Sequence, residues 1–93
     1  MMKTLLTIFL LCCATPGWSA CYADYKAKQD SPLKLHYGVA ELPDNACNRG
    51  AARRVIAQRL SRGGWNLLEV MSVFDQSGLN SRRDRAGAFF LKY

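Results

Sequence analysis

The sequence has little of what most catalytic and metal sites require. It contains a single histidine, His36, and its four cysteines never occur at the C-x-x-C spacing of zinc and redox sites. It also lacks a phosphate-binding glycine loop, a dinucleotide-binding fingerprint and a nucleophile elbow. We therefore predict no catalytic residue, no cofactor and no metal site, and we expect that the protein is not an enzyme.

No hydrophobic run in the sequence is long enough to span a bilayer. The longest run, residues 4–14, follows Lys3 and ends before a Pro-Gly pair, which is the pattern of a signal peptide. We expect a signal peptide over residues 1–20 and a mature chain that is periplasmic or secreted. A retained membrane anchor is one alternative. The stretch Trp-Ser-Ala-Cys also resembles a bacterial lipoprotein box, in which Cys21 would carry the lipid.

Removal of the signal peptide changes the cysteine content. Cys12 and Cys13 leave with the signal, whereas Cys21 and Cys47 remain. An even pair of cysteines in an exported chain predicts a disulfide bond, and two unpaired thiols are the alternative. Closing a loop of this length stabilises a protein by about 3–4 kcal/mol in the loop-entropy model. That is a large share of the stability of so small a domain.

Three stretches have the composition of β-strands. Residues 65–74 (WNLLEVMSVF) follow two glycines and are apolar on both faces, which predicts a strand inside the sheet; a buried helix is the alternative. Residues 33–42 alternate apolar and polar side chains, which predicts a half-buried strand with His36 on its more solvated face. Residues 88–93 (AFFLKY) predict a closing strand.

One stretch has clear helical periodicity. Small and aliphatic residues recur at helical spacing from Ala52 to Leu60, which predicts a helix that starts at Asn45 or Asn48 as its N-cap, runs to about Arg62 and is followed by Gly63. Residues 79–86 (LNSRRDRA) contain a form of the capping box and predict either a short second helix or a loop. Residues 21–32 are largely polar, and we expect an N-terminal arm that the disulfide fastens to the domain.

Together these elements predict one α+β domain over residues 33–93. Its architecture is a small three-stranded sheet with one helix packed on a face, in the order β-α-β-β, with or without the short second helix. A single helix covers only one face of a sheet. The arm, residues 79–86 or a second copy of the chain would then cover the other face.

The order of these elements supports a family resemblance. The stretch Gly-Gly-Trp-Asn-Leu-Leu-Glu-Val, between Tyr-Gly-Val-Ala-Glu-Leu-Pro and Phe-Phe-Leu-Lys-Tyr, resembles a small bacterial domain of unknown function that has a Gly-Trp-Glu-Leu signature. Gly64, Trp65, Leu67 and Val70 match that signature, and Asn66 replaces its glutamate. The mature chain is also similar to small exported bacterial proteins of unknown function. These resemblances imply the fold and export, and they imply no active site.

The sequence is basic, with a formal net charge of +6. Without Lys3, the predicted mature chain has twelve Lys and Arg residues against seven Asp and Glu. Arginines are concentrated on the predicted first helix and in residues 79–86, and two such groups attract anions if they lie on one surface. A solvated basic surface with no specific ligand is the alternative. The candidate anion-binding residues are Arg49, Arg53, Arg54, Arg82, Arg83 and Arg85.

These observations predict a small exported interaction module without enzymatic activity. Its open sheet face would contact a protein partner or a second copy of the chain. The alternative is a binder of anionic envelope components, either acidic lipid or polysaccharide, through the arginines. Export makes nucleic acid the less favoured anionic partner, although the charge alone permits it.

Overall fold

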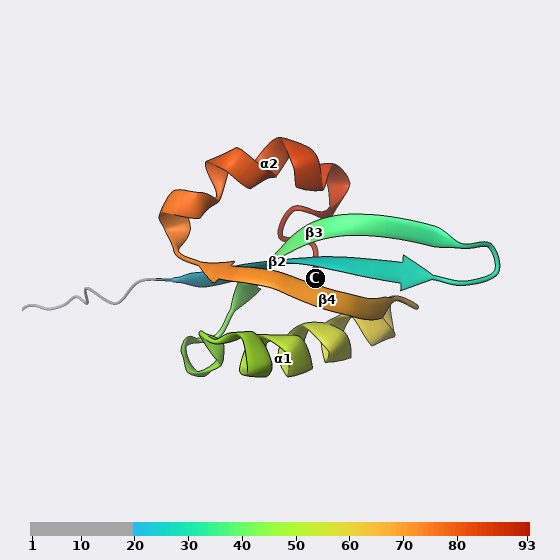
Figure 1. Cartoon of the computed structure of the whole chain (residues 1–93), viewed down its shortest axis with the longest axis horizontal. Coiled ribbons are helices and arrows are strands. Elements are labelled where there is room, and N and C mark those ends of the chain that lie inside the picture. The colour runs from blue at the N-terminus through green and yellow to red at the C-terminus, as the bar shows by residue number, and fades with distance from the viewer. Residues whose placement is uncertain (1–19) are drawn as a thin grey trace, which may run out of the picture.

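The computed structural model describes residues 20–93 (Figure 1). Residues 1–19, which hold nearly all of the predicted signal peptide and its membrane-anchor alternative, lie outside the described residues. Within the described part of the chain, none of the helices combines the length and the apolar character that a membrane span needs.

A three-stranded antiparallel sheet forms the middle layer. Its order is β3-β2-β4, with β2 (Cys21–Gln29) in the centre, and β3 (Lys34–Leu42) and β4 (Asn66–Phe74) on either side. Strands β2 and β3 form a hairpin. β4 begins opposite Lys28, so the hairpin projects beyond the sheet as a two-stranded extension, visible at the right of Figure 1.

Helix α1 (Arg49–Arg62) covers one face of this sheet. Its start is fixed by Asn48, whose Oδ1 accepts a hydrogen bond from the backbone N–H of Ala51 at 2.8 Å. Its buried residues Ala52, Ile56 and Leu60 pack on a sheet face rich in alanine. Because alanine side chains are small, the helix approaches the strands closely. The alanines that line this face are Ala23, Ala27 and Ala40.

The largest fully buried side chain on the α1 face is Tyr25. Its ring lies against Gly38 on the neighbouring strand, and a Cβ atom at Gly38 would come within 2.5 Å of the Tyr25 hydroxyl. A glycine is therefore required opposite this tyrosine, since any larger residue would displace the ring.

The opposite face is covered by the last third of the chain. After the short 3-10 helix η3 (Gln76–Gly78) come helix α2 (Asn80–Ala86) and the 3-10 helix η4 (Gly87–Phe89). Ala86 of α2 is buried with Tyr22 and Val39 in a second, smaller core. The sheet therefore lies between two helices, α1 on one side and α2 on the other (Figure 1).

The final residues cross the edge of β3. Phe90 forms an isolated parallel bridge with Val39, and the N–H of Leu91 donates to the Val39 carbonyl at 2.8 Å. Phe90 packs in the smaller core on the α2 side. Phe89 lies on the α1 side, because it stacks on His36, and the strand partner of His36, Ala27, belongs to the α1-side core. This segment therefore contacts both layers of the fold.

A disulfide bond joins Cys21, at the start of β2, to Cys47, just before α1, with the two Cα atoms 5.8 Å apart. The predicted pairing is thus confirmed. The alternative in which Cys21 carries a lipid is wrong for this structure, because lipid attachment needs the same sulfur atom that the disulfide uses.

The α+β class, the three-stranded sheet with a helix on one face, the α1 helix and the short second helix are all confirmed. Two predicted elements are wrong. Residues 21–32 do not form an arm, because they contain the central strand, and residues 88–93 contain a single bridge instead of a closing strand. The observed order is β-β-α-β-α. Residues 66–74 do form a strand, but it lies at the edge of the sheet because β2 occupies the centre.

Candidate binding surface and the polar network that supports it

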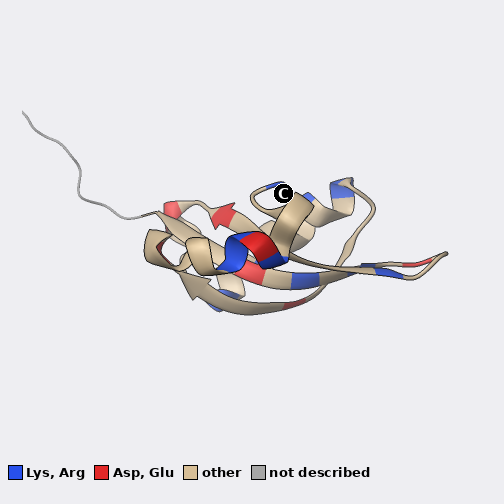
Figure 2. Ribbon diagram, turned by 90° about the horizontal axis from the view of Figure 1, so that it is seen from above, with Lys and Arg blue, Asp and Glu red and all other residues tan. Residues whose placement is uncertain are grey.

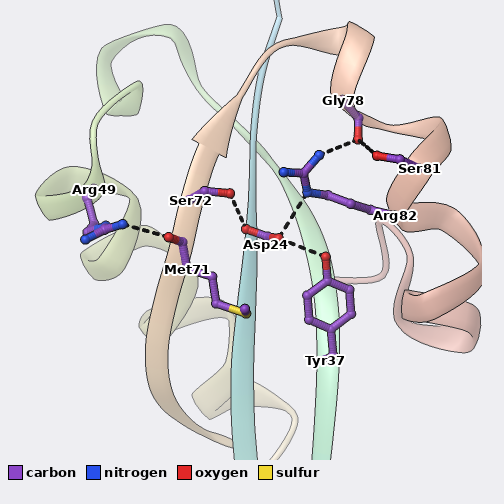
Figure 3. Close-up of polar contacts among 8 residues, drawn as sticks. All are labelled: Asp24, Tyr37, Arg49, Met71, Ser72, Gly78, Ser81 and Arg82. Atoms are coloured by element: carbon purple, nitrogen blue, oxygen red, sulfur yellow. Dashed lines mark hydrogen bonds and ion pairs between the residues drawn. The ribbon is translucent and has the colours of Figure 1, made fainter.

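A buried carboxylate lies between the sheet and α2. Asp24 of β2 is 4% exposed, and three side chains from three different elements donate to it (Figure 3). The Tyr37 hydroxyl donates to Oδ2 at 2.8 Å, the Arg82 Nε donates to Oδ2 at 3.0 Å, and the Ser72 hydroxyl donates to Oδ1 at 2.6 Å. Asp24 therefore connects all three strands and helix α2.

The electrostatics of this network favour the charged form of Asp24. Burial raises the pKa of its carboxyl, but the hydrogen bonds from Ser72, Tyr37 and Arg82, with the Arg82 charge, outweigh burial and leave the pKa below its usual range. Burial and the hydrogen bond to Asp24 in turn raise the pKa of the Tyr37 hydroxyl. The Tyr37 hydroxyl is thus held in the protonated form that donates to the carboxylate, as a structural network requires.

The arginines of α2 contact the protein itself. Arg82 pairs with Asp24, lies 3.9 Å from the centre of the Phe74 ring and donates through Nη1 to the Gly78 carbonyl at 2.7 Å. The guanidinium carbons of Arg83 and Arg85 lie 4.5 Å from the ring centres of Phe90 and Tyr37, respectively. Through the ion pair and these cation–π contacts, the three arginines hold α2 and the final segment against the sheet.

The arginines of α1 lie on the other side of the sheet. Arg49 donates to the Met71 carbonyl of β4 at 2.7 Å, as Figure 3 shows, and Arg53 and Arg54 are exposed. The two arginine groups are therefore on opposite faces of the sheet (Figure 1) and do not form one surface. The convergence on which the anion-binding hypothesis depends is not present in the structure.

His36 is buried, and the prediction that it lies on the more solvated face is wrong. It is 8% exposed, it stacks on Phe89 with ring centres 3.8 Å apart, and the Trp65 ring lies nearly perpendicular to it with ring centres 4.3 Å apart. A hydrogen bond of 3.0 Å joins its Nε2 to the Tyr25 hydroxyl, whereas its buried Nδ1 has no partner. The aromatic residues of the final segment, which the alternation in β3 does not reveal, explain this burial.

The environment of His36 favours the neutral ring. Burial and, to a smaller extent, the charge of Lys92 lower the pKa of His36. Burial also raises the pKa of the Tyr25 hydroxyl. His36 thus serves as an aromatic core residue that anchors the final segment to β3.

The open part of the sheet lies beyond α2, toward the projecting end of the hairpin. Helix α2 covers Val39 but does not reach Leu35, which is 66% exposed, or Leu68, which is 44% exposed. With Lys26 and Tyr37, these leucines line a shallow cavity of about 270 Å³, whose walls are mainly apolar. Leu33, at the turn of the hairpin, is 65% exposed. We call Leu33, Leu35, Tyr37 and Leu68 the open apolar surface.

Basic side chains lie around this surface. Lys26, Lys28 and Lys34 are on the two hairpin strands (blue in Figure 2), and Arg85 stacks on Tyr37 at the α2 side. The nearby acidic residues are Asp30, whose carboxylate lies 3.7 Å from the Lys28 amine, and Glu69, which is opposite Lys26 in the strand register. Positive charge therefore predominates at the open end of the sheet.

Among residues 20–93, no three His, Cys, Asp or Glu side chains are grouped so that they could hold a metal ion. A comparison with protein-family models finds no match, and comparisons with curated proteins and with solved structures find none either. The resemblance to the Gly-Trp-Glu-Leu domain therefore stays a prediction.

Proposed function

We propose that this protein is a small interaction module without enzymatic activity, exported to the periplasm or the cell exterior, and that it binds through the open apolar surface. The observation that supports this proposal most directly is the exposure of Leu33, Leu35 and Leu68 at one end of the fold. Exposed apolar side chains grouped together and bordered by charged residues are typical of interaction sites.

The contrast between the two ends of the α2-side face supports the same proposal. At one end, α2 and its arginines cover the sheet and connect to the Asp24 network. At the other end, the same face is left open. The network holds Tyr37 through its hydroxyl, so one wall of the cavity is rigid. A preorganised wall reduces the entropic cost of binding.

The second candidate function, binding of anionic envelope components through the arginines, has less support. Arg82, Arg83 and Arg85 already contact a carboxylate or an aromatic ring of this protein.

The disulfide supports export, because such bonds persist in oxidising compartments. The partner in this proposal can also be a second copy of the chain, in which case a homodimer buries the open apolar surface.

The experiment is retention of the purified, processed protein on the isolated envelope fraction of the producing cells. The double variant Leu35→Ser, Leu68→Ser should lose most of the retention, because it removes the two leucines of the cavity. The control is the double variant Arg53→Gln, Arg54→Gln, on the opposite face, which should be retained like the wild type. Equal retention of all three proteins would contradict the proposal.

A further inference from the structure

The end of the β2–β3 hairpin carries side chains that the fold itself does not use. Between Lys28 and Leu35 and the turn, the hairpin has only two strands, because β4 starts opposite Lys28 and does not extend further toward the turn. Pro32 and Leu33 in the turn are exposed, and so is Leu35. No other part of the described chain covers these apolar groups, which therefore stay in water unless a partner removes them from it.

The charges at this end are arranged around the apolar groups. Lys34 stands between Leu33 and Leu35 in the sequence, and strand alternation directs its side chain to the opposite face of the hairpin from Leu35. Lys28 is the register partner of Leu35 on β2, and its amine lies 3.7 Å from the carboxylate of Asp30. Lys26 lies two residues further from the turn, opposite Glu69. Lysine side chains are long enough to keep their amines in a polar layer while their carbon chains accompany neighbouring apolar groups into a less polar one.

The shape of the hairpin end distinguishes between partners. It is narrow and projects from the body of the fold, as Figures 1 and 2 both show. A projecting end with two leucines provides little area for a protein interface of standard size. It does suit a bilayer, because apolar side chains can enter the boundary between headgroups and acyl chains while basic side chains contact lipid phosphates.

We propose that the hairpin end docks on the surface of an anionic lipid bilayer. Leu33 and Leu35 enter the interface, and Lys26, Lys28 and Lys34 contact the headgroup phosphates. This inference rests on the proposed function, since it names the partner of the open apolar surface. It assigns the charge contacts to the hairpin lysines, in place of the arginines of α1 and α2.

The test uses the purified, processed protein and vesicles of phosphatidylglycerol and phosphatidylcholine, with vesicles of phosphatidylcholine alone for comparison. Flotation should recover the protein with the anionic vesicles, and recovery should fall as the salt concentration rises. The variant Leu33→Ser, Leu35→Ser should bind at least about tenfold more weakly, because burial of even one leucine accounts for roughly that factor.

Two further variants test whether binding depends on the hairpin lysines themselves or only on the net positive charge of the protein. Lys28→Gln, Lys34→Gln should weaken binding about 25-fold at low salt and reduce its salt dependence, since each basic residue near an anionic surface contributes about fivefold. Arg53→Gln, Arg54→Gln removes the same charge from exposed positions of α1 and should bind like the wild type. Leu91→Ser is the apolar control, because Leu91 is 42% exposed away from the hairpin.

The outcomes that would overturn the inference are distinct. Failure of the wild type to float with anionic vesicles overturns it, and so does an arginine variant as weak as the lysine variant. Equal binding to phosphatidylcholine alone overturns the role of the lysines. If the vesicles fail but retention on the envelope fraction still depends on Leu35 and Leu68, the partner is a protein or polysaccharide, and the proposed function stands. If that retention is also absent, both proposals are wrong.

Discussion

The Nε atom of Arg82 lies 3.0 Å from Oδ2 of Asp24, so a salt bridge joins helix α2 to the central strand of the sheet. The Asp24 side chain is 5% exposed and that of Arg82 is 24% exposed. Helix α2 is only seven residues long and too short to be stable alone. Its position therefore depends on this ion pair and on the small core around Val39.

Replacement of Asp24 by alanine should destabilise the protein by about 3 kcal/mol. This is the lower end of the range for a broken buried ion pair, because Arg82 keeps partial access to water. Urea denaturation followed by circular dichroism measures the change. Asp30→Ala is the matched control, since its pair with Lys28 is exposed and should contribute less than about 0.5 kcal/mol. Equal effects of the two substitutions would show that the Asp24 network does not hold the fold together.

The same network predicts a loss of stability in acid. The pKa of Asp24 is lower in the folded protein than in the unfolded chain, so the unfolded chain binds more protons and stability rises with pH. The contribution is complete above the ordinary Asp pKa of about 3.9 and is lost as the pH falls through the lower folded-state value. The free energy of unfolding of the wild type should therefore fall more steeply below pH 4 than that of Asp24→Asn. Parallel curves would contradict this account.

His36 predicts a second pH dependence at milder acidity. Its pKa is lowered in the folded protein, so the neutral ring contributes stability above the ordinary His pKa of about 6.5, and this is lost as the pH falls. Besides the aromatic rings that pack on it, the groups that face the ring are the Tyr25 hydroxyl and the Lys92 amine, and neither carries a negative charge that would stabilise the protonated form. Thermal denaturation from pH 7.5 to 5 should show a decrease that is absent in His36→Phe. A wild type whose stability is constant over this range would refute the prediction.

Loss of the disulfide should cost about 3–4 kcal/mol, since the bond closes a loop between residues 26 positions apart. The double variant Cys21→Ser, Cys47→Ser tests this in urea denaturation. Addition of reductant should bring the wild type to the stability of the variant and leave the variant itself unchanged. A wild type that does not respond to reductant would contradict the prediction.

The contact between Tyr25 and Gly38 predicts a large effect of a single methyl group. Gly38→Ala places a Cβ atom 2.5 Å from the Tyr25 hydroxyl and 2.6 Å from its ring, which should destabilise the fold by about 1–3 kcal/mol. Gly50→Ala is the control, because a Cβ atom there would approach no neighbour closer than 3.6 Å. A variant at Gly38 as stable as the one at Gly50 would show that the ring moves aside freely.

Much of the architecture could be predicted from local patterns. The asparagine N-cap, the apolar stripe and the glycine after Arg62 define α1, and the apolar run between Asn66 and Phe74 defines β4. The disulfide followed from the two cysteines that remain after the predicted signal is removed. Each of these signals lies within a short stretch of sequence, so no knowledge of distant contacts was needed.

The central strand could not be recognised so directly. Residues 21–29 alternate correctly, with Ala23, Tyr25 and Ala27 facing α1, but the alanines are small and a buried aspartate lies between them. Asp24 is buried only because Arg82, 58 positions later, provides the compensating charge. The burial of His36 likewise depends on Phe89 at the far end of the chain. The sequence predicts an open sheet face, but the residues that form it depend on where α2 ends, short of Leu35.

The two outer edges of the sheet have a consequence for behaviour at high concentration. The N–H of Leu91 occupies the Val39 carbonyl on β3, and the Arg49 guanidinium occupies the Met71 carbonyl on β4. A strand from another molecule would have to displace one of these donors before it could extend the sheet. Arg49, a candidate anion-binding residue in the sequence, thus helps to keep neighbouring molecules from joining edge to edge into fibres.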